Sequence, residues 1–257
     1  MRSTDTRHLA MPAASAGILM ATYLLLRPYG DADSATSPEA AAAYASQWWV
    51  VAHLAGSLAL VQVGRLGLRI DDLLGTTTTF AARWTGLAGA VLVLPIYGAE
   101  TFGLHAVGRA GLADATAMTL VGGVRGQDHP AGMTLFALGL LLVTVSGVCT
   151  ALAWQRAVRS GRWTAPAWAA WPLGIGAALV LPQFYLPPTG RMGFGVAFAV
   201  AAAVLAVAAL RDGRGRPPTR NVGPTQGPGE AQSPSVLRPW ETTLRSGVKT
   251  TAGSLPS

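Results

Sequence analysis

Glu100 stands out among the residues of this chain that could do chemistry, because it is a carboxyl group within a long apolar stretch. Residues 84–106 contain no other Asp, Glu, Lys or Arg. An acidic residue near the middle of a membrane-spanning helix costs about 2.5 to 3.5 kcal/mol on insertion scales. We therefore expect Glu100 to be protonated, hydrogen-bonded to a partner or exposed to a watery cavity, and to face other helices and not lipid.

Four further residues are candidates for a binding pocket with Glu100. Tyr97 comes three residues earlier, so it lies on about the same helix face. His105 ends the same stretch, whereas His53 and Gln183 lie in two other apolar stretches. Polar side chains in membrane helices either mark binding sites and pathways or simply hydrogen-bond neighbouring helices. Both interpretations stay open for His53, and solvent exposure is the simpler one for His105. For Glu100 we favour a functional role over a protonated side chain that hydrogen-bonds His53 or Gln183.

The apolar stretches that position these residues predict an all-α membrane protein. Hydrophobic residues make up 51% of the chain and charged residues 12%, and the charges cluster between long uncharged runs. A helix needs about 20 apolar residues to cross a hydrocarbon core of about 30 Å. We expect a six-transmembrane-helix bundle whose first span is not a cleaved signal peptide. The expected spans are at about residues 9–26, 44–66, 84–106, 131–154, 167–186 and 192–210.

The remaining segments predict the domain organisation. Residues 1–211 form the expected transmembrane domain, with Pro95 kinking the third span. Residues 212–257 are rich in Pro, Gly, Ser, Thr and Arg, which predicts a disordered cytoplasmic tail. We also expect a charged loop from Arg65 to Arg83 and a short interfacial helix within residues 112–121.

The arginines predict the orientation of the bundle. Twelve of those near the ends of the expected spans lie on the side of the two termini, against Arg27, Arg109, Arg125 and Arg191 on the other side. Cytoplasmic loops carry the excess of basic residues, so we expect both termini in the cytoplasm. The candidate residues then gather in an outward-facing polar pocket between the second, third and fifth spans, centred on Glu100 and His53. Abundant alanine and a single lysine favour a GC-rich bacterial source and thus a plasma membrane.

Two cofactor hypotheses were weighed, and neither is favoured. A b-type haem between His53 and a second histidine conflicts with the height difference of about 8 Å expected between His53 and His105. A divalent metal could use His53, Glu100 and either His105 or His129, but no motif with ligand spacing supports it. A haem- or metal-dependent membrane enzyme or electron carrier is therefore the alternative interpretation, and no cofactor is expected.

Binding or movement of a small molecule, a lipid or a proton through the outward-facing pocket ranks ahead of catalysis. The chain has no P-loop, Rossmann glycine pattern or nucleophile elbow. Its net charge of +7 resides largely in arginines at span ends, where they meet lipid head groups, so we expect no nucleic acid partner. The expected partners are the lipid bilayer and other membrane proteins.

Overall fold

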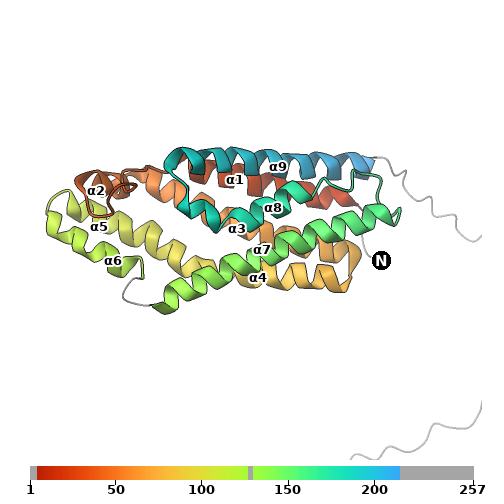
Figure 1. The fold of residues 1–257 in the computed structure, drawn as a ribbon, viewed down its shortest axis with the longest axis horizontal. Coiled ribbons are helices and arrows are strands. Elements are labelled where there is room, and N and C mark those ends of the chain that lie inside the picture. The colour runs from red at the N-terminus through yellow and green to blue at the C-terminus, as the bar shows by residue number, and fades with distance from the viewer. Residues whose placement is uncertain (1–4, 127–129, 215–257) are drawn as a thin grey trace, which may run out of the picture. The chain divides into compact units, whose positions relative to one another are not determined.

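The computed structural model describes residues 5–126 and 130–214, and all regular elements in these residues are helical (Figure 1). Residues 215–257 of the predicted tail and His129 lie outside the described residues, whereas residues 212–214, predicted as the start of the tail, are helical. The α-helices are α1 (Ala10–Leu26), α2 (Pro38–Ala45), α3 (Gln47–Leu74), α4 (Thr77–Gly98), α5 (Leu104–Gly111), α6 (Val121–Val124), α7 (Pro130–Arg159), α8 (Trp171–Leu179) and α9 (Pro188–Arg214). A π-helical turn, η2 (Ala99–Gly103), joins α4 to α5, and three short 3₁₀ helices are η1 (Thr6–Leu9), η3 (Ala115–Leu120) and η4 (Pro182–Tyr185).

Five helical stretches in the described residues are long and apolar enough to cross a membrane. The prediction of an all-helical fold is thus confirmed for the described residues, and these five stretches are candidate membrane spans. They are Thr6–Leu26, Gln47–Leu74, Thr77–Gly111, Pro130–Arg159 and Pro188–Gly213. The stretch expected as the fifth of six spans, residues 167–186, is helical only over the 9 residues of α8 and in η4. Nine residues rise about 14 Å, and prolines at 172 and 182 bound the helix, so α8 is shorter than a membrane is thick.

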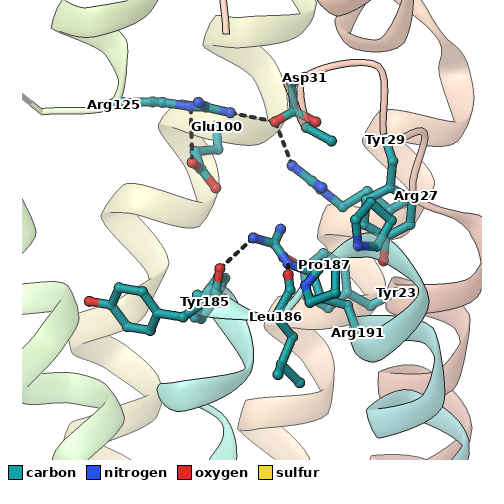
Figure 2. A pocket seen from close by; sticks show the side chains of 13 residues that line it. Tyr23, Arg27, Tyr29, Asp31, Glu100, Arg125, Tyr185, Leu186, Pro187 and Arg191 are labelled. Atoms are coloured by element: carbon teal, nitrogen blue, oxygen red, sulfur yellow. Dashed lines mark hydrogen bonds and ion pairs between the residues drawn. The ribbon is translucent and has the colours of Figure 1, made fainter. Parts of the chain in front are cut away.

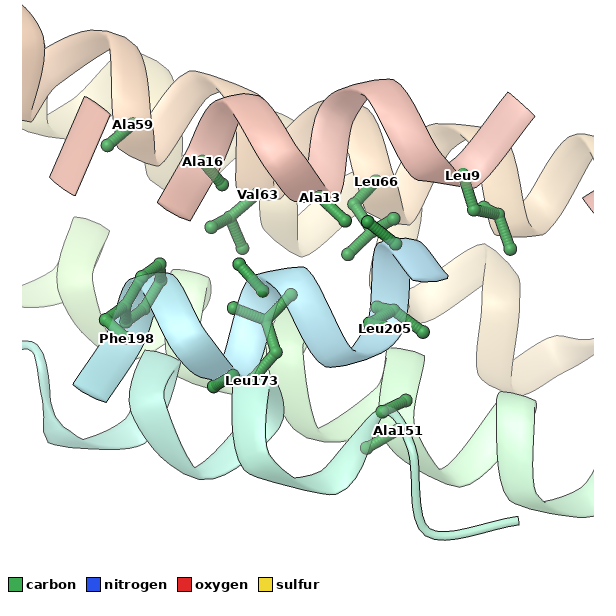
Figure 3. Close-up of a cluster of buried hydrophobic side chains, with 14 of the residues drawn as sticks. Leu9, Ala13, Ala16, Ala59, Val63, Leu66, Ala151, Leu173, Phe198 and Leu205 are labelled. Atoms are coloured by element: carbon green, nitrogen blue, oxygen red, sulfur yellow. The ribbon is translucent and has the colours of Figure 1, made fainter. Parts of the chain in front are cut away.

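Small residues allow the long helices to pack closely. In this part of the chain α1 lies against α3 and α9, while α4 lies against α3 and α7 (Figure 1). A Cβ atom added at Gly67 of α3 would lie 2.5 Å from the carbonyl oxygen of Ala82 in α4. The Ser146 hydroxyl of α7 donates to that carbonyl at 2.7 Å. Figure 3 shows the buried core between the helices, where alanines alternate with Leu, Val and Phe. Contact between backbones and small side chains is a usual means of helix association in membranes.

The prediction of a charged loop between the second and third spans is wrong, because α3 and α4 extend through these residues on both sides of a tight turn. α3 runs to Leu74 and α4 begins at Thr77. Gly75 takes the left-handed conformation at φ 59°, and Thr76 forms a capping box with Thr79. Arg83 pairs with Asp71 at 3.4 Å between the two helices. Hydropathy shows where an apolar stretch ends, but a helix can continue into the polar residues that follow, as α3 does here.

Short helices form a cap at one end of the long helices. α2 lies against α5, and η3 lies against α5 and α6 (Figure 1). A second apolar cluster holds them together and contains Ala40, Ala41, Tyr44, Trp49, Leu104, Val107, Met118 and Val121. The expected short helix within residues 112–121 corresponds to η3 and the start of α6. This packing brings the segment after α1 and the segment after α6 close to η2.

Candidate anion-binding pocket

A cavity of about 640 Å³ lies where the ends of α1, η2, α6 and α9 meet (Figure 2). We call it the arginine pocket. It is lined by Tyr23, Arg27, Tyr29, Asp31, Ala32, Glu100, Arg125, Phe184, Tyr185, Leu186, Pro187, Pro188 and Arg191. Three guanidinium groups therefore face two carboxyl groups around one cavity, beside an apolar wall from residues 184–188.

Asp31 links two of the arginines. Its Oδ2 atom lies 2.7 Å from a terminal nitrogen of Arg27 and 2.7 Å from a terminal nitrogen of Arg125. The side chains of Asp31 and Arg27 are only 5% and 7% exposed. The Arg27 guanidinium also lies over the rings of Tyr29 and Trp49, at 5.0 Å and 4.8 Å from their centroids. Burial and ring contacts fix this arginine in position.

The π-helical turn η2 presents Glu100 to the cavity. The amide of Leu104 donates to the carbonyl of Ala99, five residues back, so the usual bond to the Glu100 carbonyl is not made. The Trp49 indole nitrogen donates to this carbonyl at 2.8 Å. Pro95, four residues before Ala99, cannot donate an amide hydrogen to the preceding turn. The local widening is thus stabilised by a side chain from α3.

The carboxyl group of Glu100 is held more loosely than that of Asp31. Oε1 lies 3.7 Å from Nε of Arg125, and Oε2 lies 3.8 Å from Nε2 of His53. Both distances exceed hydrogen-bond length. The side chain is 24% exposed, whereas that of Asp31 is 5% exposed. Glu100 is therefore the carboxyl group of the pocket that can rearrange toward a ligand.

His53 is buried behind Glu100 in a defined tautomer. Its Nδ1 atom lies 2.8 Å from the carbonyl oxygen of Trp49, and a carbonyl only accepts, so Nδ1 carries a hydrogen. In the neutral ring the Nε2 atom that faces Glu100 is then an acceptor. The imidazole stacks on Trp49 at 4.0 Å between centroids and contacts Tyr23 at 5.4 Å. The ring orientation is set by these contacts from α1 and α3.

Arg191, in the first turn of α9, faces the same cavity with backbone partners. Its Nε donates to the carbonyl of Leu186 at 3.0 Å, and a terminal nitrogen donates to the carbonyl of Phe184. Within residues 5–126 and 130–214 no carboxylate is in ion-pair distance of this guanidinium. Figure 2 shows Arg191 and the Glu100 carboxyl group directed into the cavity from opposite walls. With both carboxyl groups ionised, the lining keeps one excess positive charge.

Buried polar atoms without hydrogen-bond partners concentrate around this pocket. Among the described residues they include Nε of Arg27, Nε of Arg125 and Oδ1 of Asp31. Outside the spans, burial raises the pKa of Tyr44, beside Arg125, to about 12, and burial also raises that of Tyr29. These phenols stay neutral near pH 7, so the charges at the pocket belong to the arginines and carboxyl groups.

The structure brings three of the sequence-predicted residues together. Glu100 lines the cavity, His53 lies behind it, and Tyr97 contacts the His53 ring at 6.4 Å between centroids. Gln183 is buried beside the lining residue Phe184, and its Oε1 lacks a hydrogen-bond partner in the described structure. His105 lies apart, with Nδ1 2.8 Å from the carbonyl of Tyr44. No group of three His, Cys, Asp or Glu side chains in the described residues forms a metal-ligand set.

The sequence interpretation did not place Arg27, Asp31, Arg125 or Arg191 in the pocket. Three of these are arginines that it assigned to the side opposite the termini. Basic residues on that side run against the usual bias of membrane proteins. Their presence there was the available signal. What brings them to one place is the packing of α2, α5 and η3, which hydropathy does not reveal.

Comparisons with protein-family models, with curated proteins and with solved structures found no significant match for this chain.

Proposed function

We propose that this protein binds an anionic group, a phosphate or a carboxylate, in the arginine pocket. The observation that carries the proposal is Arg191, whose guanidinium lines the cavity with backbone carbonyls as its described partners. A guanidinium suits a carboxylate or phosphate, because its planar donors match two oxygens at once. Arg27 and Arg125 line the same cavity and add to its positive charge.

The start of α9 adds to the positive potential. Pro188 and Arg191 belong to its first turn and line the cavity. The positive end of the helix dipole favours an anion there, although Pro188 has no amide hydrogen and the Arg191 amide donates to the Pro187 carbonyl. The lining also contains Leu186 and Pro187, so an apolar portion of a ligand has a surface to contact. This combination suits an amphipathic anion, either a lipid head group or a small soluble molecule.

The proposed setting is a bacterial plasma membrane that the chain crosses six times, with both termini in the cytoplasm. The hydroxyl of Thr6 donates to the carbonyl of Ala209 at 2.8 Å, so the chain returns to the end where it started. Five long helices need one further pass to do so, and residues 163–187, with α8 at their centre, are our candidate for it. The excess of arginine at the end that holds Thr6 and Ala209 supports its cytoplasmic assignment. The pocket then opens to the extracytoplasmic side.

Binding of defined anions to the full-length protein in phosphatidylcholine nanodiscs tests this function. The probes are inorganic phosphate and acetate in solution, and phosphatidylglycerol incorporated in the nanodisc. We expect at least one probe to bind, and Arg191→Gln to weaken its binding about tenfold or more, the usual scale for a charge-assisted hydrogen bond.

Arg109→Gln is the matched control, because Arg109 is exposed near the end of α5 and does not line the cavity. It should bind like the wild type. Binding only of phosphatidylglycerol identifies a lipid site, and binding of phosphate or acetate identifies a site for soluble anions. Equal losses in both variants, or no binding of any probe by a folded protein, would contradict the proposed function.

A further inference from the structure

The geometry between His53 and Glu100 offers a place for one proton. The Nδ1 hydrogen of His53 is committed to the Trp49 carbonyl, so a neutral ring directs the Nε2 lone pair at Glu100. An ionised Glu100 carboxylate faces this acceptor at 3.8 Å, and the imidazole is only 1% exposed, so Arg125 is the group that balances the carboxylate charge. One proton added to the pair makes the contact favourable, either as a carboxylic acid that can move closer and donate to Nε2 or as an imidazolium facing a carboxylate.

We infer that the His53–Glu100 pair is a proton-binding site and that the arginine pocket takes up an anion and one proton together. This inference rests on the proposed function and adds a second ligand to it. Without an anion, ionised Glu100 helps to neutralise Arg125 at 3.7 Å. When an anion occupies the cavity it takes over that role, and the negative charge on Glu100 becomes unfavourable. Transfer of a proton from water to the pair removes the repulsion.

The charged and titratable groups around Glu100 come from every element that meets at the pocket. They are Tyr23 and Arg27 of the α1 end, Tyr29 and Asp31 after it, His53 of α3, Tyr97 of α4, Arg125 after α6, Tyr185 of η4 and Arg191 of α9. Asp31 accepts two charge-assisted hydrogen bonds at 2.7 Å, so its carboxylate already has two cationic partners. The tyrosines are neutral near pH 7 and the arginines keep their charge. Only Glu100 and His53 are left to change protonation with the ligand.

Coupling of this kind predicts a defined pH dependence. If one proton binds with each anion, the anion dissociation constant rises by up to about tenfold per pH unit once the free pair has lost its proton. The affinity therefore falls as the pH rises. The range to cover is about pH 5 to about pH 8, and Arg27, Arg125 and Arg191 keep their charge throughout it.

Calorimetry on the full-length protein in nanodiscs tests the coupling with whichever probe binds, inorganic phosphate, acetate or phosphatidylglycerol. Repeating the titration in two buffers of different ionisation heat counts the protons taken up on binding. We expect close to one proton for the wild type and close to none for Glu100→Gln, since the amide mimics the protonated acid and keeps the anion site. Glu100→Gln should also bind phosphatidylglycerol, whose phosphodiester keeps its charge, with little dependence on pH. Phosphate itself changes charge in this range, so for that probe the test is the difference between the wild type and Glu100→Gln.

A second variant keeps the test decisive if Glu100→Gln fails to fold. His53→Gln replaces the imidazole behind Glu100 by an amide that does not take up a proton, and we expect it to shift the pH at which affinity falls while leaving the anion site in place. Wild-type binding that is independent of pH and takes up no proton would overturn the coupling and leave the proposed function standing. Absence of binding at every pH would overturn both.

Discussion

At the scale of single residues, Asp31 is the carboxylate that pairs with two of the three arginines of the pocket. One of its oxygens accepts hydrogen bonds from both Arg27 and Arg125, and its side chain is almost fully buried. A buried ion cluster usually stabilises a protein no more than apolar packing would, because its charges must be desolvated. Removing one member of the cluster is destabilising as well, because it leaves a buried charge unpaired. In the described structure both arginines also keep a buried Nε atom without a hydrogen-bond partner, so this cluster is poorly optimised for stability alone.

Asp31→Asn is expected to destabilise the protein by about 3 kcal/mol, because two arginines would lose their shared carboxylate in a desolvated place. Thermal unfolding in detergent, followed by circular dichroism, measures the change. Asp33→Asn is the matched control, since Asp33 is exposed on the same segment and should leave stability nearly unchanged. Equal stability of the two variants would show that Asp31 does not hold the arginines.

The sequence points to Glu100 because a carboxyl group in an apolar run carries a large free-energy cost of membrane insertion. This cost can be inferred from the residue and its neighbours in the sequence, without knowledge of the fold. The arginines carry a weaker signal, because basic residues are ordinary at the ends of apolar stretches and only the side on which these arginines lie is unusual. Trp49 lies in the first turn of α3, where tryptophan is often an interface anchor, yet it is buried, stacks on His53 and donates to the Glu100 carbonyl. The role of such residues depends on contacts between segments far apart in the chain.

At the scale of elements, close approach of α3, α4 and α7 fixes the frame to which η2 is attached. Gly67 lies against the carbonyl of Ala82, where Ser146 also donates its hydroxyl. Gly64 lies against Gly86 one turn farther along the same interface, with a Cβ position 2.8 Å from the Gly86 carbonyl oxygen. Two glycines on one face therefore let two backbones meet, and the position of Glu100 relative to His53 follows from this contact.

Gly67→Ala is expected to destabilise the protein by about 1 to 3 kcal/mol, because the added methyl group would overlap the Ala82 backbone and the helices would have to separate. Gly193→Ala makes the same chemical change in α9, where no atom lies within 4 Å of the new Cβ. That variant should be neutral or slightly more stable, since alanine favours helix over glycine. Thermal unfolding of the two variants in one detergent compares them, and a neutral Gly67→Ala would disprove the close contact.

Hydropathy correctly predicts that the described residues are helical. It predicts less well where each helix begins and ends. The stretch at residues 167–186 has the composition of a span, but Pro172 and Pro182 restrict its helix to α8. The charged residues from Arg65 to Arg83 favour a loop by polarity, but capping by Gly75 and Thr76 and the pairing of Arg83 with Asp71 extend the helices instead. Turn chemistry and ion pairs between helices outweigh hydropathy at these positions.

At the scale of the whole molecule, polar residues gather at the two opposite ends of the long helices in the described part of the chain. The arginine pocket lies beside the cap made by α2, α5, η3 and α6, and the termini of the described residues meet at the end where Thr6 bonds Ala209. At that end Asp212 is buried and accepts hydrogen bonds from Thr164 and Thr6. The first and last long helices and the segment before α8 are thereby held together. Which of the two ends faces the cytoplasm decides from which side an anion enters.

Cysteine labelling in intact cells tests the proposed orientation. In a Cys149→Ser background, Asp33→Cys places an exposed thiol between α1 and α2, and Ser160→Cys places one just after α7. We expect a membrane-impermeant maleimide to label the first variant and not the second, because the excess of arginine at the end of α7 assigns that end to the cytoplasm. Labelling of both after the membrane is permeabilised is the control for thiol access. The reverse pattern would place the arginine pocket on the cytoplasmic side, where the proton and the anion would both come from the cell interior.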